Sequence, residues 1–130
     1  MPLLPVNPAS LMPPRGYSHG MKGTGELVFV AGQTGANREG RMVSGDLVGQ
    51  FAQALDNVLD VVWHAGGGPE HVARMAVYVT DKAEYIRRRR ELGAAWRKRM
   101  GRHYPAMVLV EVAALLPDDA LIEIEAVALL

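Results

Sequence analysis

Two carboxylates near the C-terminus are the residues whose type and spacing best suit chemistry. Glu123 and Glu125 alternate with large aliphatic residues in "LIEIEAVALL", residues 121–130, so both side chains point to one face of an expected strand. A carboxylate enclosed in a pocket has a raised pKa and can act as a general acid or base. The same pattern also fits strand residues held in salt bridges. The two glutamates alone do not decide between these roles.

Other residue types that support common chemistries lack the spacing those chemistries need. The chain has no cysteine, so it offers no thiolate nucleophile, disulfide or cysteine-based zinc site. Its histidines show no metal-ligand spacing such as HExxH; they are His19, His64, His71 and His103. The glycines of "GMKGTG", residues 20–25, do not join a strand to a helix, as a dinucleotide-binding loop requires. We therefore expect no metal and no cofactor.

A run of four arginines, residues 87–90, raises the question of nucleic-acid binding. Eight of the fourteen basic residues lie between positions 87 and 102. The formal net charge of zero and the lack of an aromatic stacking ladder argue against a nucleic-acid groove. Consecutive residues of a helix also point in different directions, so at most two of the four arginines share a face. We expect a solvated helix face whose arginine stems lie along the surface.

Length and composition describe an ordinary globular chain. With 130 residues, 49% of them hydrophobic and 22% charged, residues 1–130 are expected to form one domain. Residues 1–15 are interrupted by prolines and are expected to be an extended arm, and they lack the basic region of a signal peptide. No apolar run reaches membrane-spanning length. These features predict a cytoplasmic protein without membrane partners.

The hydrophobic pattern predicts an α+β fold. Asp46 is an expected N-cap for a helix that ends at Gly66, and Asp81 with Glu84 resembles a capping box for a second helix that stops at Gly101. Strands are expected at residues 17–21, 26–33, 72–79, 106–114 and 121–129. This order predicts one mixed sheet with two helices on one face. The other face of that sheet needs a partner.

The last two expected strands present unusual faces. In "HYPAMVLVEV", residues 103–112, alternation places Met107, Leu109 and Glu111 together. This set mixes apolar residues with a carboxylate, as the Glu123 and Glu125 face does. Such a mixture in two adjacent strands favours a subunit interface or a pocket wall over a solvated surface. We therefore expect the face that carries Met107 to contact a neighbouring subunit or a ligand.

Five segments occur in an order that is specific when taken together. They are "LVFVAGQ", "FAQALDNVLDVVWHAGG", "VYVTD", "YPA" followed by "EV", and "IEIEAVA". From about Tyr17 to Leu129, the chain resembles the Rid family of reactive intermediate deaminases, formerly labelled L-PSP endoribonucleases or translation inhibitors. The resemblance implies a chorismate-mutase-like fold assembled as a homotrimer. The helix-free sheet faces would meet in its middle, with ligand clefts between adjacent subunits.

The resemblance also implies roles for single residues. Deaminating members hydrolyse an imine or enamine derived from an amino acid, with attack by water and release of ammonia. A residue matching Glu123 positions or protonates that water, and one matching Tyr17 helps to line the cleft. The residue after Pro-Ala is an arginine in those members, and it grips the carboxylate of the substrate. Here that residue is Met107, and Ala31 stands where those members have a cleft serine.

The missing arginine changes what the cleft is expected to bind. A charge-assisted pair contributes about 1.5–3 kcal/mol, so a 2-imino acid should bind at least about tenfold worse here. Methionine instead offers a flexible apolar wall. Another cation could replace the arginine from segments that could reach the cleft. These candidates are Arg15, His19, Arg90, Arg102 and His103.

Three functions remain open from the sequence. The first is a trimeric hydrolase of an imine, enamine or related metabolite, with Glu123 as the catalytic residue and Tyr17, Ala31 and Met107 as substrate-binding residues. The second is a non-catalytic trimer that binds a metabolite. The third is an endoribonuclease, as the former family label suggests.

Overall fold

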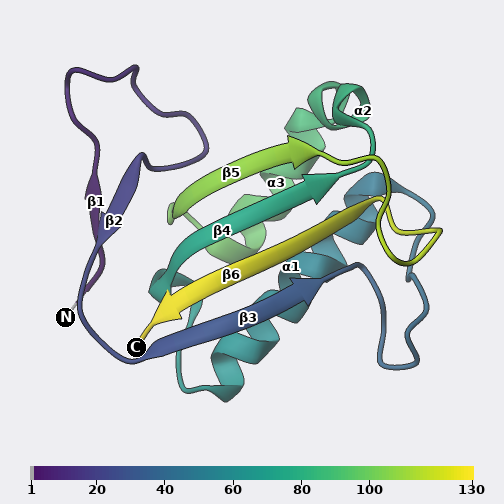
Figure 1. Cartoon of the computed structure of the whole chain (residues 1–130), viewed down its shortest axis with the longest axis horizontal. Coiled ribbons are helices and arrows are strands. Elements are labelled where there is room, and N and C mark those ends of the chain that lie inside the picture. The colour runs from purple at the N-terminus through teal and green to yellow at the C-terminus, as the bar shows by residue number, and fades with distance from the viewer. Residues whose placement is uncertain (1) are drawn as a thin grey trace.

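The computed structural model describes residues 2–130 and confirms the α+β class. Its main sheet has the order β3-β6-β4-β5, in which β6 is antiparallel to both neighbours while β4 and β5 are parallel. The strands are β3 (Leu27–Gln33), β4 (Val72–Val79), β5 (Ala106–Glu111) and β6 (Ile122–Leu129). Figure 1 shows helices behind this sheet and none over the face turned to the viewer.

The helices are α1 (Leu47–His64), α2 (Lys82–Arg87) and α3 (Arg89–Met100), with a short 3₁₀ helix η1 (Pro69–His71) before β4. The predicted start and end of α1 are confirmed. The Asp46 carboxylate accepts the backbone N–H of Val48 at 3.2 Å, which satisfies an otherwise free donor of the first turn. Gly66 has a φ of +103°, a conformation that glycine adopts without a steric penalty. No helix within residues 2–130 is long and apolar enough to cross a membrane.

The core lies between the sheet and the helices. Met75, Val77 and Val79 of β4 point to the helices and are fully buried, as are Ile122 and Ile124 of β6. Helix α1 meets them with an apolar stripe at helical spacing. The stripe is Leu47, Phe51, Ala54, Leu55, Val58 and Val62. Each large side chain buried in this layer contributes roughly 1.5–3 kcal/mol.

Gln50 is the one glutamine or asparagine in residues 2–130 that is fully buried. Its amide nitrogen donates to the carbonyls of Ser44 at 3.0 Å and Asp119 at 2.9 Å. Its amide oxygen accepts the N–H of Leu121 at 2.7 Å. Gln50 therefore connects the loop before α1 to the turn before β6, and its buried amide satisfies three backbone groups of these segments.

The N-terminal region departs from the prediction. β1 (Leu4–Val6) and β2 (Gly20–Lys22) pair with each other as a separate antiparallel ribbon, visible at the left of Figure 1. The expected strand at residues 17–21 therefore does not join one common sheet, and the expected arm at residues 1–15 contains β1. Local alternation identified extended chain correctly, but strand partners depend on contacts that alternation does not encode.

The predicted second helix is divided at Arg88. Its guanidinium binds the carboxylates of Asp46 at 2.8 Å, Glu84 at 3.1 Å and Glu91 at 2.8 Å. The backbone of Arg88 leaves helical geometry at φ −100° and ψ 14°, so α2 and α3 are separate elements. The hydrogen bonds from Arg88 hold the pKa values of Asp46 and Glu91 below their ordinary range. Strand β5 also ends at Glu111, before the expected Ala114.

Replacing Gln50 with leucine should destabilise the fold by about 2–5 kcal/mol, because two carbonyls and one N–H lose the buried amide that they bond. Gln53→Leu is the matched control, since Gln53 is half-buried and bonds only the side chain of Asn57. Its expected effect is below about 1 kcal/mol. Urea unfolding measures both variants, and equal destabilisation would contradict the role assigned to Gln50.

Candidate functional site

The four predicted site residues form two groups on opposite faces of the sheet. Met107 lies beside Met75 in the parallel pair of β4 and β5, whereas Glu123 lies beside Tyr78 in the antiparallel pair of β4 and β6. Positions three apart in one strand point to opposite faces, and Met75 points to the helices. Met107 therefore faces the helix side and Glu123 the helix-free side. The prediction that their strands are adjacent and share one surface is wrong.

Met107 and Tyr17 line the same cavity on the helix side. This cavity has a volume of about 320 Å³, and its lining is Arg15, Gly16, Tyr17, Tyr85, Met107 and Leu109. Ser18 fixes the position of Tyr17, because its N–H donates to Pro105 at 3.0 Å and its hydroxyl donates to the carbonyl of Tyr104 at 2.6 Å. The segment that carries Tyr17 is thereby attached to the start of the edge strand β5.

A second cavity of about 360 Å³ continues from the first. Both are lined by Arg15, Gly16, Tyr85 and Met107. The second is also lined by Phe51, Arg89, Leu92, Gly93, Trp96, Arg97 and Tyr104. The rings of Trp96 and Tyr104 stack with centroids 5.9 Å apart and planes 6° apart. We call the two cavities together the helix-side pocket.

The charged lining of the helix-side pocket is entirely positive. Arg15, Arg89 and Arg97 line it, and no aspartate or glutamate among the described residues 2–130 does. Within residues 2–130 these three guanidiniums form no ion pair and no hydrogen bond, in contrast to Arg88 and Arg99. Burial raises the pKa of the Tyr85 hydroxyl, so Tyr85 is a neutral hydrogen-bonding group at physiological pH.

Only one of the five cations expected from the sequence lines the pocket, namely Arg15. A ring nitrogen of His19 bonds the carbonyl of Met12 at 2.7 Å, and one of His103 bonds that of Val72 at 2.7 Å. Arg90 and Arg102 are absent from the lining. Sequence reasoning missed Arg89 and Arg97. Their signal was a spacing of four residues on either side of Gly93, which places all three on one helix face.

Glu123 and Ala31 come together on the helix-free side. In the β3–β6 pair, Val30 lies opposite Ala126 and Gln33 opposite Ile124, so β3 holds one extra residue in a bulge at Ala31 and Gly32. A β-carbon at Gly32 would lie 2.6 Å from a carboxylate oxygen of Glu123. The Glu123 side chain therefore occupies the space that glycine leaves beside Ala31.

Glu125 is engaged elsewhere on this face. The hydroxyl of Tyr78 donates a hydrogen bond to the Glu125 carboxylate, and this bond raises the pKa of Tyr78. Glu123 has no hydrogen-bond or ion-pair partner within residues 2–130. Of the two glutamates, Glu123 is therefore the one whose carboxylate is free to meet a ligand or a water molecule.

Apolar side chains cover much of the helix-free face around these groups. Phe29 is 73% exposed and Leu27 is 59% exposed, both on the edge strand β3. Val108 and Val110 of β5 are exposed on the same face. An exposed apolar surface that crosses a whole sheet indicates an interaction surface.

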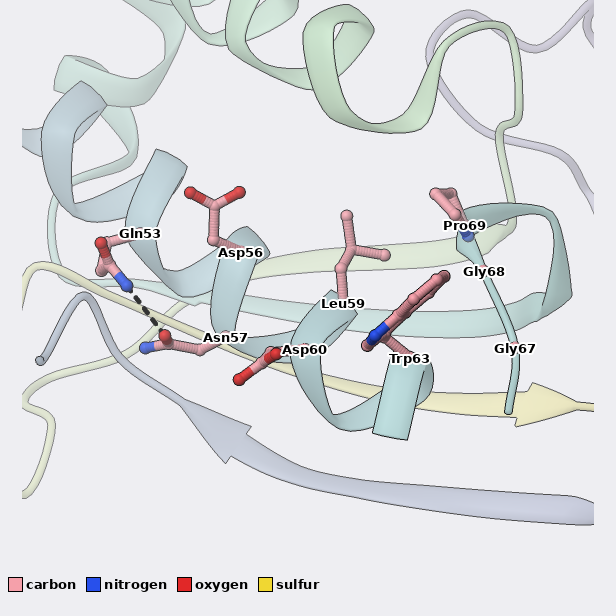
Figure 2. Close-up of a pocket in the computed structure, with 9 residues that line it drawn as sticks. All are labelled: Gln53, Asp56, Asn57, Leu59, Asp60, Trp63, Gly67, Gly68 and Pro69. Atoms are coloured by element: carbon pink, nitrogen blue, oxygen red, sulfur yellow. Dashed lines mark hydrogen bonds between the residues drawn. The ribbon is translucent and has the colours of Figure 1, made fainter. Parts of the chain in front are cut away.

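A groove on the outer side of α1 contains none of the predicted residues. Figure 2 shows it between α1 and the turn at Gly67, Gly68 and Pro69, with a volume of about 460 Å³. Its carboxylate Asp56 pairs with Arg99 at 2.7 Å, and Asp60 lies 3.4 Å from His64. Within residues 2–130, no three side chains of histidine, aspartate or glutamate are grouped so that they could hold a metal ion.

Comparisons with known proteins agree over nearly the whole chain. The sequence model of the family described as Endoribonuclease L-PSP matches residues 8–130. A RutC family protein of Pyrococcus horikoshii is 34% identical over 113 residues, covering 86% of this chain and 85% of that protein. The 2-iminobutanoate/2-iminopropanoate deaminase of Escherichia coli K12 is 33% identical over 107 residues, covering 80% of each.

Solved structures show the same relationship. A member of the conserved Rid protein family from Yersinia pestis, of unknown function, superposes with a TM-score of 0.87 and 33% identity over 100% of both chains. The YjgF gene product of E. coli superposes with a TM-score of 0.70 and 32% identity, covering 95% of this chain and 92% of that one.

Replacing Gly93 with alanine should stabilise the protein by about 0.5–1 kcal/mol, because glycine is a poor helix former. The added β-carbon would lie 3.1 Å from a terminal nitrogen of Arg97, and that flexible side chain can move away. Gly101→Ala is the matched control. It should destabilise, since Gly101 has a φ of +62°. Thermal unfolding measures both variants, and a destabilised Gly93→Ala would show that this site has no room for a methyl group.

Proposed function

The chain belongs to the Rid family, also described as the endoribonuclease L-PSP family, and we propose that it is a hydrolase acting on an imine, enamine or related metabolite in clefts between the subunits of a homotrimer. The observation that carries this proposal is the separation of Glu123 from the helix-side pocket within one chain. A site that uses both needs a second copy of the protein.

The positions of the two groups support a ring of subunits. Met107 lies on the edge strand β5, whereas Ala31 lies on β3 at the other edge of the sheet, next to the Glu123 carboxylate. A contact that joins the β5 edge of one copy to the β3 edge of the next uses two different surfaces. Head-to-tail contacts close into a ring when the rotation between successive copies completes a full turn, and in such a ring the exposed apolar residues of the helix-free face would be buried.

The proposed chemistry uses Glu123 as the group that handles water. The oxygen of a water molecule bonds to the imine carbon, while the Glu123 carboxylate takes a proton from that water. Glu123 passes this proton to the nitrogen, which gives a carbinolamine with a hydroxyl and an amino group on the former imine carbon. Glu123 then takes the hydroxyl proton and delivers it to the amino group, the carbon–nitrogen bond breaks as the carbon–oxygen double bond forms, and ammonia leaves a carbonyl product. Tyr17 and Met107 of the neighbouring copy hold the substrate, and Ala31 lines the cleft beside Glu123.

The named activity of the E. coli relative supports the reaction class, and two residues argue for a different ligand. That relative is named a 2-iminobutanoate/2-iminopropanoate deaminase. Met107 and Ala31 stand here where the resemblance predicts an arginine and a serine. Small 2-imino acids should therefore be poor substrates, since the charge-assisted contact to their carboxylate is missing.

Met107→Arg should raise kcat/KM for freshly generated small 2-imino acids by at least about tenfold, because it places a guanidinium at the position where the resemblance predicts one. Glu123→Gln should abolish ammonia release in both the native and the Met107→Arg background. Release of ammonia measured with glutamate dehydrogenase reports both effects. Glu125→Gln is the matched control, since Glu125 lies on the same face but bonds Tyr78.

Full activity in Glu123→Gln, or loss of activity in Glu125→Gln alone, would contradict the role of Glu123. Ligand binding without turnover of any imine would favour the metabolite-binding trimer. RNA cleavage that is lost in Arg88→Ala or Arg89→Ala would favour the endoribonuclease. Each of these two alternatives has an outcome that the hydrolase does not produce.

The native protein should have the mass of three chains in light scattering at micromolar concentration, and Phe29→Asp should lower that mass to one chain. Phe29 is 73% exposed on the helix-free face, where a carboxylate would be buried without a partner in the assembly. Trp63→Asp is the matched control, because Trp63 is 71% exposed but lies on α1. A native monomer, or dissociation of the Trp63 variant, would contradict the proposed interface.

A further inference from the structure

We propose that the helix-side pocket binds a small organic anion with an apolar or aromatic body, and that Arg15, Arg89 and Arg97 hold its charge. The inference deepens the proposed function, because Met107 and Tyr17 line the same pocket. It assigns a ligand class to residues of α3 and of the segment before Tyr17. The anion lies near α3, away from the place where a neighbouring Glu123 would act.

The charges of the pocket support an anionic ligand. Three guanidiniums line it without any carboxylate, and within residues 2–130 none of the three is neutralised. Other arginines in the same region have acidic partners: Arg88 binds Asp46, Glu84 and Glu91, and Arg99 binds Asp56. Guanidinium groups recognise carboxylate and phosphate through paired hydrogen bonds. An anion would supply the negative charge that the lining lacks.

Trp96 provides an independent observation. Its side chain lines the pocket and the residue is only 6% exposed, yet its indole N–H has no hydrogen-bond partner within residues 2–130. Buried donors in folded proteins are almost always satisfied. The nitrogen is itself covered by neighbouring atoms, so an acceptor atom of a ligand would satisfy this donor once a neighbouring side chain of the pocket moves aside.

Gly93 explains how Arg97 reaches the pocket. A β-carbon at Gly93 would lie 3.1 Å from a terminal nitrogen of Arg97, so the guanidinium lies across the space that the glycine leaves. Glycine inside a helix is unfavourable compared with alanine. Its presence in the middle of α3, on the pocket wall between Arg89 and Arg97, is accounted for by the room that a ligand and this guanidinium need.

The rest of the lining sets the character of the ligand body. Phe51, Leu92 and the stacked rings of Trp96 and Tyr104 form apolar walls at the α3 end. Met107 lies where the two cavities join, and Tyr17 and Leu109 lie only in the other cavity. A ligand held at Arg89 and Arg97 must pass across Met107 to reach Tyr17. Its charge and its reacting carbon are therefore separated by an apolar segment.

Binding of 3-phenylpropanoate tests the inference without requiring turnover. In a Trp63→Phe background, the fluorescence of Trp96 alone reports on the pocket, and calorimetry gives the affinity. The neutral 3-phenylpropanamide and the small anion propanoate should each bind at least about tenfold more weakly, since each lacks one of the two recognised parts. Comparison with 2-phenylethyl phosphate assigns the head group as carboxylate or phosphate.

Variants of the lining test the residues. Arg89→Gln and Arg97→Gln should each weaken binding of 3-phenylpropanoate by about tenfold and leave binding of the amide unchanged. Arg90→Gln and Arg102→Gln are the matched controls and should bind as the native protein does. Gly93→Leu should abolish binding of the acid and the amide alike, because its side chain fills the pocket. Circular dichroism confirms that each variant is folded.

Equal affinity for the acid and the amide, equal losses in the Arg90 and Arg89 variants, or no binding at millimolar concentration would overturn the inference. These results are distinct from failure of the proposed function. Binding of 3-phenylpropanoate by a protein that releases no ammonia would contradict only the hydrolase. Turnover of uncharged imines without anion binding would contradict only the anion pocket.

Discussion

The pairing of the central strand β4 is the constraint on which the functional geometry depends. Because β4 is parallel to β5 and antiparallel to β6, it fixes which residues of both neighbours face the helices. Met107 is paired with the buried Met75 and therefore faces the helices. Glu123 is paired with Tyr78 and therefore faces the helix-free side. No rotation of a side chain can bring these two groups together across a sheet whose middle is filled by core residues. Cooperation between them requires assembly.

The features that shape the helix-side pocket and the surroundings of Glu123 each carry a local energetic cost. Gly93 weakens α3, the bulge at Ala31 and Gly32 interrupts the β3–β6 ladder, and the indole N–H of Trp96 is left without a partner. All three lie at the cavities or beside Glu123. The buried layer formed by α1, β4 and β6 is regular by comparison, and it offsets these costs.

The sequence predicted the parts of the fold that local rules determine. Asp46 and Gly66 marked the ends of α1, and strict alternation placed Glu123 and Glu125 together on one face of β6. It failed where partners distant in sequence decide. Alternation showed that Met107 and Leu109 lie on one face of their strand. It did not show whether that face is turned to the helices or to the helix-free side. The spacing of Arg89, Gly93 and Arg97 puts them on one helix face, but it does not show that this face lines a pocket with Arg15 and Gly16, which are distant in sequence.

The exchange of arginine for methionine at position 107 is coupled to the composition of α3. Met107 is half-buried and packs against the core, so its apolar side chain needs no partner there. Two of the three unpaired charges of the pocket lie instead along α3 at Arg89 and Arg97, with Gly93 between them. An anion held there is farther from the reacting carbon than one held at position 107.

Selectivity would then depend on the distance between the charge and the imine of a substrate, and the length of its apolar body would matter as much as its charge. Changing residue 107 alone would add a second place for an anion without removing the first.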